Sequence, residues 1–262
     1  MTFTDRLYAL AFAARLSWRD FLAVYPPRVY LFTTLPRVVL QAAFFALIGY
    51  YAAGESGREF AFIGGCAHVI VLATVVRAPD VLIDERVMGT LHRVRLGVMP
   101  LPAIVAARWW VYVCAGLVDA LVAAVLVGAF VGELDLVPEL LAAAPLFLLV
   151  ALTTSGLGLV VAALSLTQRI DVLLTNLAAY LVLVFGGIVA PISVFGDVGA
   201  TIVRLLPLTN GLLAIRSFVA GEPWVAEAAL EVAVGAAWIA LAAVLIQVQS
   251  HRARHRGSDE LL

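Results

Sequence analysis

Six apolar runs, each long enough to cross a lipid bilayer, place the strongest constraint on how this chain can fold. A hydrocarbon core about 30 Å thick needs about 20 helical residues to span it. The sequence predicts such spans at residues 30–53, 59–77, 104–131, 139–166, 171–190 and 225–249. Only 13% of the residues are charged, against about 25% in a soluble domain. We therefore expect an all-α membrane protein forming a single domain over residues 1–262.

The arginines indicate how these spans are oriented, because short cytoplasmic loops of membrane proteins are rich in positive residues. One side of the predicted membrane holds Arg6, Arg15, Arg19, Arg28, Arg77, Arg86, Arg93, Arg95, Arg108, Arg169, Arg252, Arg254 and Arg256. The other side holds Arg58, Arg204 and Arg216. The side with more arginines is expected to be cytoplasmic, which places both the N-terminus and the C-terminus in the cytoplasm.

All 17 basic residues are arginine, and the chain contains no lysine. A phosphate-binding P-loop needs a lysine at the β- and γ-phosphates, so we expect no nucleotide or other cofactor bound by this chain. Cys66 and Cys114 lie in apolar runs without the spacing of metal ligands or redox pairs. We therefore expect no metal site, no catalytic residue and no removable signal peptide at the N-terminus.

Residues 1–28 are predicted to form an amphipathic helix before the first span. Apolar side chains recur at helical spacing along one stripe, and charged side chains cover most of the remaining surface. This pattern is typical of a helix that lies in the inner headgroup layer. Phe12 and Leu16 interrupt the polar face, so part of that face is also a candidate for packing against protein. Pro26 and Pro27 should end the helix and turn the chain into the membrane.

Residues 187–224, between the fifth and sixth spans, stay apolar but are divided by glycines and prolines. Pieces of about 10–12 residues are too short to cross a bilayer. Irregular backbone at membrane depth has to be buried in protein or line a water-filled cavity. We therefore expect re-entrant or interfacial helices on the outer side, which would serve as a gate or lid.

Residues 84–100, DERVMGTLHRVRLGVMP, form a charged segment between the second and third predicted spans of an otherwise apolar chain. One interpretation is a coupling helix that docks on a soluble partner. The other is a solvated loop whose arginines set the topology and contact anionic lipid. Topology explains the arginines but not Asp84 and Glu85, nor Gly89 and Thr90, which favours docking. Glu85 is also a candidate to pair with a nearby arginine and set the angle of the helix.

Together these features resemble the membrane permease subunit of ABC-2 type exporters, and the match covers nearly the whole chain. Its cytoplasmic motif corresponds to Glu85-Arg86-Val87-Met88-Gly89-Thr90-Leu91, followed by Pro100. Its outer motif, in which a small residue and a glycine precede a proline, a second proline and an arginine, corresponds to Gly186, Gly187, Pro191, Pro207 and Arg216.

The resemblance implies a division of labour between chains. A separate cytoplasmic ABC ATPase would bind ATP and Mg²⁺, and Asp84, Glu85, Arg86, Gly89, Thr90 and Leu91 would couple it to the membrane. Two permease copies, or this chain and a paralogue, would form a dimeric pathway in the bacterial inner membrane. The substrate class implied is a hydrophobic or amphipathic compound, such as a drug in multidrug resistance, a lipid or a lipid-linked glycan. No nucleic acid is expected as a partner.

Four polar residues within the predicted spans are singled out as candidate functional groups, because charged and polar groups at membrane depth are costly and normally have partners. Arg37 and Asp119 lie at comparable depth, and we expect them to pair, either as a clamp between spans or as the lining of a substrate cavity. His68 is expected to be a hydrogen-bonded interior residue rather than a proton carrier. Asn176, with Thr175, is expected either to pack or to face a central pathway.

Span four contains a run of small and hydroxyl residues, which favours close helix packing. These residues are Thr153, Thr154, Ser155, Gly156 and Gly158.

An ATP-independent channel or secondary carrier is the alternative function. It would need an ion-coupling carboxylate in a discontinuous helix, and Asp119, in an apparently continuous span, is the only candidate.

Overall fold

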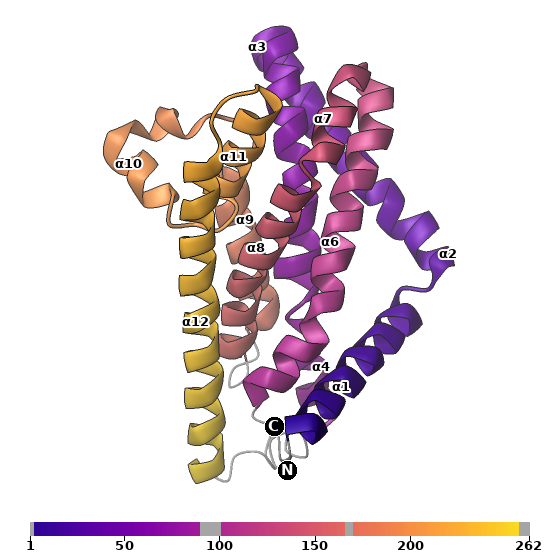
Figure 1. Cartoon of the computed structure of the whole chain (residues 1–262), viewed down its shortest axis with the longest axis vertical. Helices are drawn as coiled ribbons and strands as arrows, with labels where there is room; N and C mark the ends of the chain where they lie inside the picture. The colour runs from indigo at the N-terminus through magenta and orange to yellow at the C-terminus, as the bar shows by residue number, and fades with distance from the viewer. Residues whose placement is uncertain (1–2, 90–100, 166–169, 257–262) are drawn as a thin grey trace.

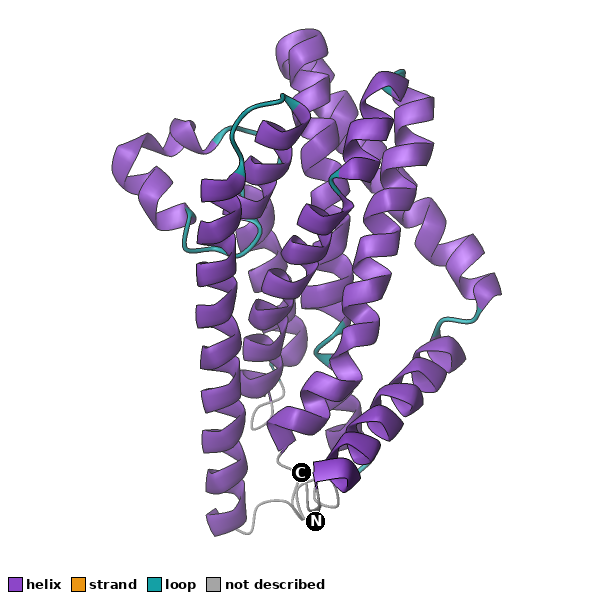
Figure 2. Cartoon of the chain, viewed as in Figure 1, coloured by secondary structure: helices purple, strands orange, loops and turns teal. Residues whose placement is uncertain are grey.

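The computed structural model describes residues 3–89, 101–165 and 170–256, and within these ranges all regular structure is helical (Figure 2). The prediction of an all-α chain is therefore confirmed for this part of the protein. Four helical stretches in it are long and apolar enough to cross a membrane, namely Pro27–Ile83, Leu101–Val131, Ala144–Ser165 and Val225–Gln249.

The N-terminal helix α1 (Phe3–Val24) ends just before the two prolines, as predicted. Pro26 is extended, with φ −62° and ψ 159°, and Pro27 occupies the first turn of the short helix α2 (Pro27–Val29), where a missing backbone N–H costs nothing. A π-helical turn, η1 (Tyr30–Thr34), then leads into the long helix α3 (Leu35–Val71). Helix α1 packs against α6 (Leu101–Val131) beside the lower part of the bundle (Figure 1).

Helix α3 is a tight hairpin rather than one straight rod. Ala53 and Gly54 leave helical geometry, and Gly54 has a φ of +70°, which glycine adopts without a steric penalty. A Cβ on Gly49 would lie 2.1 Å from the carbonyl oxygen of Gly57, and further along Gly65 packs against Ala42. The two arms therefore run side by side, which confirms the predicted division between residues 30–53 and 59–77.

The second arm continues through the π-helical η2 (Leu72–Arg77) into α4 (Asp80–Val87). After α6, the 3₁₀ turn η3 (Leu134–Leu136) precedes α7 (Val137–Ala142) and α8 (Ala144–Ser165). The sequence predicted one helix over 139–166. The structure divides it at Ala143, because Pro145 has no backbone N–H to bond to the preceding turn and instead begins a new helix.

Helix α9 (Asp171–Phe185) is shorter than the predicted span 171–190, because Gly186 and Gly187 end it and Gly187 has a φ of +77°. The outer segment then forms three short helices, η4 (Ile192–Phe195), α10 (Gly196–Val203) and α11 (Thr209–Val219). The last helix, α12 (Val225–Arg256), extends beyond the predicted end at residue 249. The start of α1 and the end of α12 lie at one end of the molecule, opposite the reversal in α3 (Figure 1).

Helix α8 lies in the centre, packed against α12, α6, α9 and α3. The predicted small-residue surface is confirmed, since a Cβ on Gly158 would lie 2.1 Å from the carbonyl oxygen of Thr74, and one on Gly235 of α12 would lie 2.2 Å from the Thr153 side chain. The hydroxyls of Thr74 and Thr154 are 2.8 Å apart across this contact. Gly158 thus brings α8 against the backbone of η2, and Gly235 brings α12 against the Thr153 side chain of α8.

Candidate functional site

A cleft of about 390 Å³ opens near the lower end of the bundle, between the start of α3, the η2–α4 junction and the start of α9. Its walls carry hydroxyl, amide and charged groups in an otherwise apolar protein, and they come from the first, second and fifth predicted spans. The residues lining it include Thr33, Thr34, Arg37, Arg77, Asp80, Asp171, Thr175 and Asn176. The cleft therefore has room and polarity for the head of an amphipathic molecule.

Asp119 lies on α6 behind this cleft, fully buried. Its carboxylate accepts a hydrogen bond of 3.0 Å from the Tyr30 hydroxyl and lies 3.8 Å from Nη1 of Arg77. The Arg77 guanidinium also lies over the ring of Tyr25, 5.2 Å from its centroid. This cluster joins η1, η2, α6 and the turn that follows α1, and it supports the back wall of the cleft.

The predicted ion pair between Arg37 and Asp119 is wrong, because the basic partner of Asp119 is Arg77. Gly116, one turn before Asp119, lies against Ile70 and Ala73, so α6 and η2 approach closely and Arg77, at the end of η2, reaches the carboxylate. Arg37 is exposed on the cleft wall. The two roles predicted for the Arg37–Asp119 pair were a clamp between spans and the lining of a cavity. In the structure Arg77 and Asp119 form the clamp, and Arg37 lines the cavity.

The other two polar residues predicted within spans occupy different places. His68 is buried, with Nδ1 2.8 Å from the Gln41 amide nitrogen and Phe45 edge-on to its ring, so its prediction as a hydrogen-bonded interior residue is confirmed. Asn176 lines the cleft beside Thr175. The amide nitrogen of Asn176 donates to the carbonyl oxygen of Val172 at 2.8 Å, within its own helix.

At the opposite end, the outer motif gathers around α11. Arg216 donates hydrogen bonds to the carbonyl oxygens of Gly187 at 2.8 Å, Ile188 at 3.2 Å and Phe60 at 2.9 Å. Its guanidinium carbon lies 3.4 Å from the centroid of the Phe60 ring. Three carbonyls satisfy donors of a cation that has left water, and α11 is thereby tied to the ends of α9 and of the α3 hairpin.

The remaining residues of the outer motif shape the backbone around this contact. Gly186 is packed so closely that a Cβ would lie 2.3 Å from the carbonyl oxygen of Val182. Pro191 is extended and begins η4. Pro207 is buried in the turn before α11. The structure therefore brings Gly187 and Arg216 into direct contact, and the other three residues bend the chain around them.

Glu231 of α12 is a buried residue that the sequence analysis missed. Its carboxylate accepts hydrogen bonds from the backbone N–H of Leu208 at 2.7 Å, from that of Gly211 at 2.9 Å and from the Thr153 hydroxyl. Leu208 has a φ of +88°, unusual for a residue with a side chain. A carboxylate at a helix N-terminus satisfies free N–H groups and the helix dipole. A glutamate two turns inside an apolar span was the signal available in the sequence.

The charged segment after the second span begins with α4, where Glu85 accepts a hydrogen bond from Arg108 of α6. The same guanidinium lies 3.5 Å from Asp20 of α1, and Ser17 donates to the carbonyl oxygen of Arg108. The prediction that Glu85 pairs with a nearby arginine is confirmed. Arg108 thus joins α1, α4 and α6 at one point.

Gly89 follows the end of α4 with a φ of +68°, the left-handed conformation that often ends a helix. A Cβ there would meet nothing within 4 Å, so the requirement for glycine at this position is one of backbone conformation. Thr90 and Leu91 lie outside the described residues, as do the side chains of Asp84 and Arg86. Their predicted coupling roles remain predictions.

The family model described as ABC-2 type transporter matches residues 14–219, which include the cleft, the α4 segment and the outer motif. No curated protein and no solved structure matches the chain. Among the described residues, no group of three or more His, Cys, Asp or Glu side chains is arranged to hold a metal ion.

Proposed function

Since the chain belongs to the ABC-2 type transporter family, whose membrane component is a multi-pass permease, we propose that it is the permease subunit of an ATP-driven exporter. It moves a hydrophobic or amphipathic compound outward, and a separate cytoplasmic ABC ATPase supplies the energy. The observation that carries this proposal is the polar cleft lined by Arg37, Arg77 and Asn176 in an otherwise apolar bundle. The site of function is expected to be the bacterial inner membrane.

In this proposal the polypeptide crosses the membrane six times, with both termini in the cytoplasm. The hairpin supplies the first two crossings, and α6, α8, α9 and α12 supply the others. The shared end of α1 and α12, opposite the hairpin turn, supports this orientation (Figure 1), as does the distribution of arginines. The cleft then opens toward the cytoplasm, where a substrate would be taken up.

A second permease copy, or a related permease, is proposed to complete the pathway. Large apolar side chains project outward on both sides of the cleft, among them Phe32 and Phe44 before and within α3, and Leu173 and Tyr180 on α9, which are 58–77% exposed. Large apolar side chains exposed in this way are typical of a protein or membrane interface. Packing of these faces against a second subunit would turn the open cleft into an enclosed passage.

Coupling to the ATPase is proposed to pass through α4 and the residues that follow it, including Asp84, Arg86, Thr90 and Leu91. The support is the contact between Glu85 and Arg108, since a force applied to α4 by a soluble partner would reach α6 and α1 through one guanidinium. Charge-assisted hydrogen bonds of this type are stronger than neutral ones and fix geometry.

The proposal is tested by isolating the protein from native membranes and identifying its partners by mass spectrometry. Recovery of a soluble chain with a GxxxxGK[ST] motif, and ATPase activity that changes when the permease is present, would support it. A transport-competent complex without any nucleotide-binding chain would refute it in favour of a channel or secondary carrier.

Variants of the Arg108 contacts test the coupling step separately. Glu85→Gln should leave membrane insertion and ATPase binding intact while reducing transport per ATP hydrolysed severalfold. Asp20→Asn is the matched control, because its longer contact with the same guanidinium is exposed and should matter little. Unchanged transport per ATP in Glu85→Gln would remove this contact from the coupling route.

A further inference from the structure

An open pocket of about 630 Å³ lies along α1, on the flank that faces away from the core. Phe12, Leu16 and Trp18 line it with 66%, 42% and 43% of their surfaces exposed, and Trp110 of α6 completes the wall. The sequence analysis raised packing against protein for Phe12 and Leu16. Among the described residues none covers them, so this apolar surface is open in the part of the chain that the structure describes.

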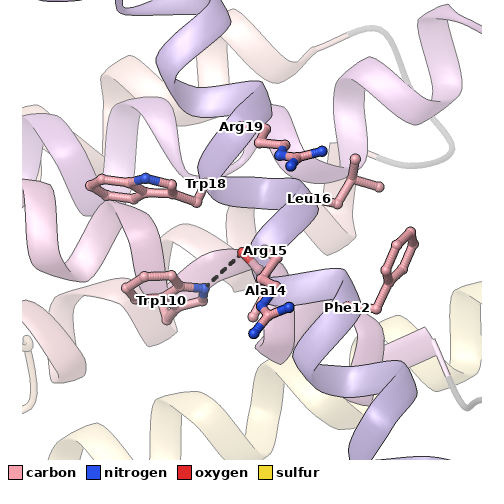
Figure 3. Close-up of a pocket in the computed structure, with 7 residues that line it drawn as sticks. All are labelled: Phe12, Ala14, Arg15, Leu16, Trp18, Arg19 and Trp110. Carbon is pink, nitrogen blue, oxygen red and sulfur yellow. Dashed lines mark hydrogen bonds between the residues drawn. The ribbon is translucent and has the colours of Figure 1, made fainter.

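Two arginines accompany this apolar surface. Arg15 and Arg19 are one helical turn apart, so their side chains lie on the same face of α1, and both are exposed in the pocket. Figure 3 shows Trp18 and Trp110 on one side of α1, Phe12 and Leu16 on the other, and Arg15 between these groups. Among the described residues no acidic side chain forms an ion pair with either arginine, whereas Asp20 pairs with Arg108.

The pocket is formed by the protein itself. Trp18 and Trp110 are stacked with their ring centroids 5.9 Å apart, and the Trp110 indole N–H donates to the carbonyl oxygen of Ala14 at 3.4 Å (Figure 3). On the inner side of α1, Ser17 is buried and donates to the carbonyl oxygen of Arg108. These contacts hold α1 against α6, so the two guanidinium groups and the apolar wall are presented together in a preformed arrangement.

We infer that this pocket binds one anionic phospholipid of the inner leaflet, with its phosphate between Arg15 and Arg19 and its two acyl chains on either side, one along Phe12 and Leu16 and the other along Trp18 and Trp110. Two cations without an acidic partner complement a phosphate, and the apolar walls suit a hydrocarbon chain but not a free anion in water. Basic residues on an amphipathic interfacial helix attract anionic lipid. The inference rests on the proposed orientation, which places α1 at the cytoplasmic surface.

The bound lipid would do more than anchor α1 to the membrane, because it would also affect the position of α4. The face of α1 opposite the pocket contacts Arg108, which in turn holds Glu85 at the start of the proposed coupling segment. A lipid that fixes α1 therefore also fixes the position of α4.

The test measures retention of phosphatidylglycerol by the full chain, purified in detergent, with native mass spectrometry. Arg15→Gln/Arg19→Gln should weaken retention about 30-fold relative to wild type, since each arginine contributes about 1 kcal/mol and 1.4 kcal/mol corresponds to a factor of ten. Arg28→Gln is the matched control, being an exposed arginine outside the pocket, and should retain the lipid. Because both substituted arginines are exposed and make no ion pair among the described residues, the double variant is expected to fold normally.

A second measurement uses the wild-type fold and locates the acyl chain. Phosphatidylglycerol with brominated acyl chains should quench tryptophan fluorescence, and part of that quenching should be lost in Trp18→Phe. Phosphatidylcholine retained equally well, inorganic phosphate displacing the lipid, or equal retention by the double variant would each overturn the inference. So would loss of ATPase binding in the double variant with lipid retention unchanged, because the pocket would then be a protein interface. The lipid-retention and quenching measurements use the permease alone, so failure of the proposed transport function would not alter their outcome.

Discussion

Replacing Glu231 with leucine should be among the most damaging single changes outside the cleft. The substitution keeps the apolar character of α12 but removes the acceptor for two backbone N–H groups, those of Leu208 and Gly211, and for the Thr153 hydroxyl. The site is completely buried, so no water replaces the carboxylate. The start of α11 would be left with unsatisfied donors in an apolar setting.

The expected cost follows from that count. A buried donor left without a partner costs about 1–3 kcal/mol, so two backbone donors give a loss of roughly 2–6 kcal/mol. Polar contacts between membrane helices often contribute less, about 0.6 kcal/mol on average, so the lower half of the range, near 3 kcal/mol, is expected. Glu231→Gln keeps one acceptor oxygen and should cost about 1–2 kcal/mol.

The assay is thermal unfolding of the purified protein in detergent, followed by tryptophan fluorescence. Glu231→Leu should lower the melting temperature by roughly 6–12 °C, at about 2–4 °C per kcal/mol, and Glu231→Gln by about half as much. Glu222→Leu serves as the control, because Glu222 is exposed at the same end of the molecule. Unfolding of Glu231→Leu at the wild-type temperature would refute the argument that this carboxylate holds the start of α11.

A double-mutant cycle tests whether the stability lost in Glu231→Leu depends on the contact between Glu231 and Thr153. If Thr153→Val and Glu231→Leu act through the same contact between α8 and α12, their combined cost should be less than the sum of the single costs. Strict additivity would show that the two side chains do not interact, and the short contact between them would then have no energetic role.

Three further substitutions test the packing and the buried ion pair. Gly158→Leu should destabilise the protein by about 1–3 kcal/mol, because its Cβ would lie 2.1 Å from the carbonyl oxygen of Thr74, and normal unfolding would contradict the close contact. Arg77→Leu should cost about 3–5 kcal/mol by leaving Asp119 buried without its cation, and Asp119→Asn in the same chain should recover part of this loss. Arg37→Leu should leave the melting temperature nearly unchanged while altering substrate stimulation of the ATPase, and a large loss of stability would return Arg37 to a structural role.

Span positions were predictable because length and hydrophobicity decide them. The hairpin turn at Ala53 and Gly54 fell within two residues of the predicted break, and α1 ended where two prolines required it. The errors were at helix ends fixed by local backbone geometry. The fifth helix stopped at Phe185, because glycine with positive φ followed, a conformation that hydropathy does not report.

Pairing of buried charges was less predictable, because depth along a helix does not specify the direction in which a side chain points. Arg37 was predicted at the depth of Asp119, whereas Arg77 was assigned to the cytoplasmic end of its span. The close approach of α6 to η2 at Gly116 brings Arg77 to the carboxylate instead. The role of Glu231 was not predicted for a related reason. Its partners are backbone N–H groups of a helix distant in sequence, and no side chain in the sequence marks them.

The reversal of α3 also has a consequence for how the protein is made. The turn is so tight that Gly49 of the first arm lies against the backbone of Gly57 of the second, and the charged tip beyond it is held by Arg58 bonding to Glu133 of a later loop. The first arm therefore gains its backbone contacts only when the second has been synthesised. In the proposed topology, the two arms would therefore leave the translocon together as a paired unit, with the tip crossing the bilayer once for both.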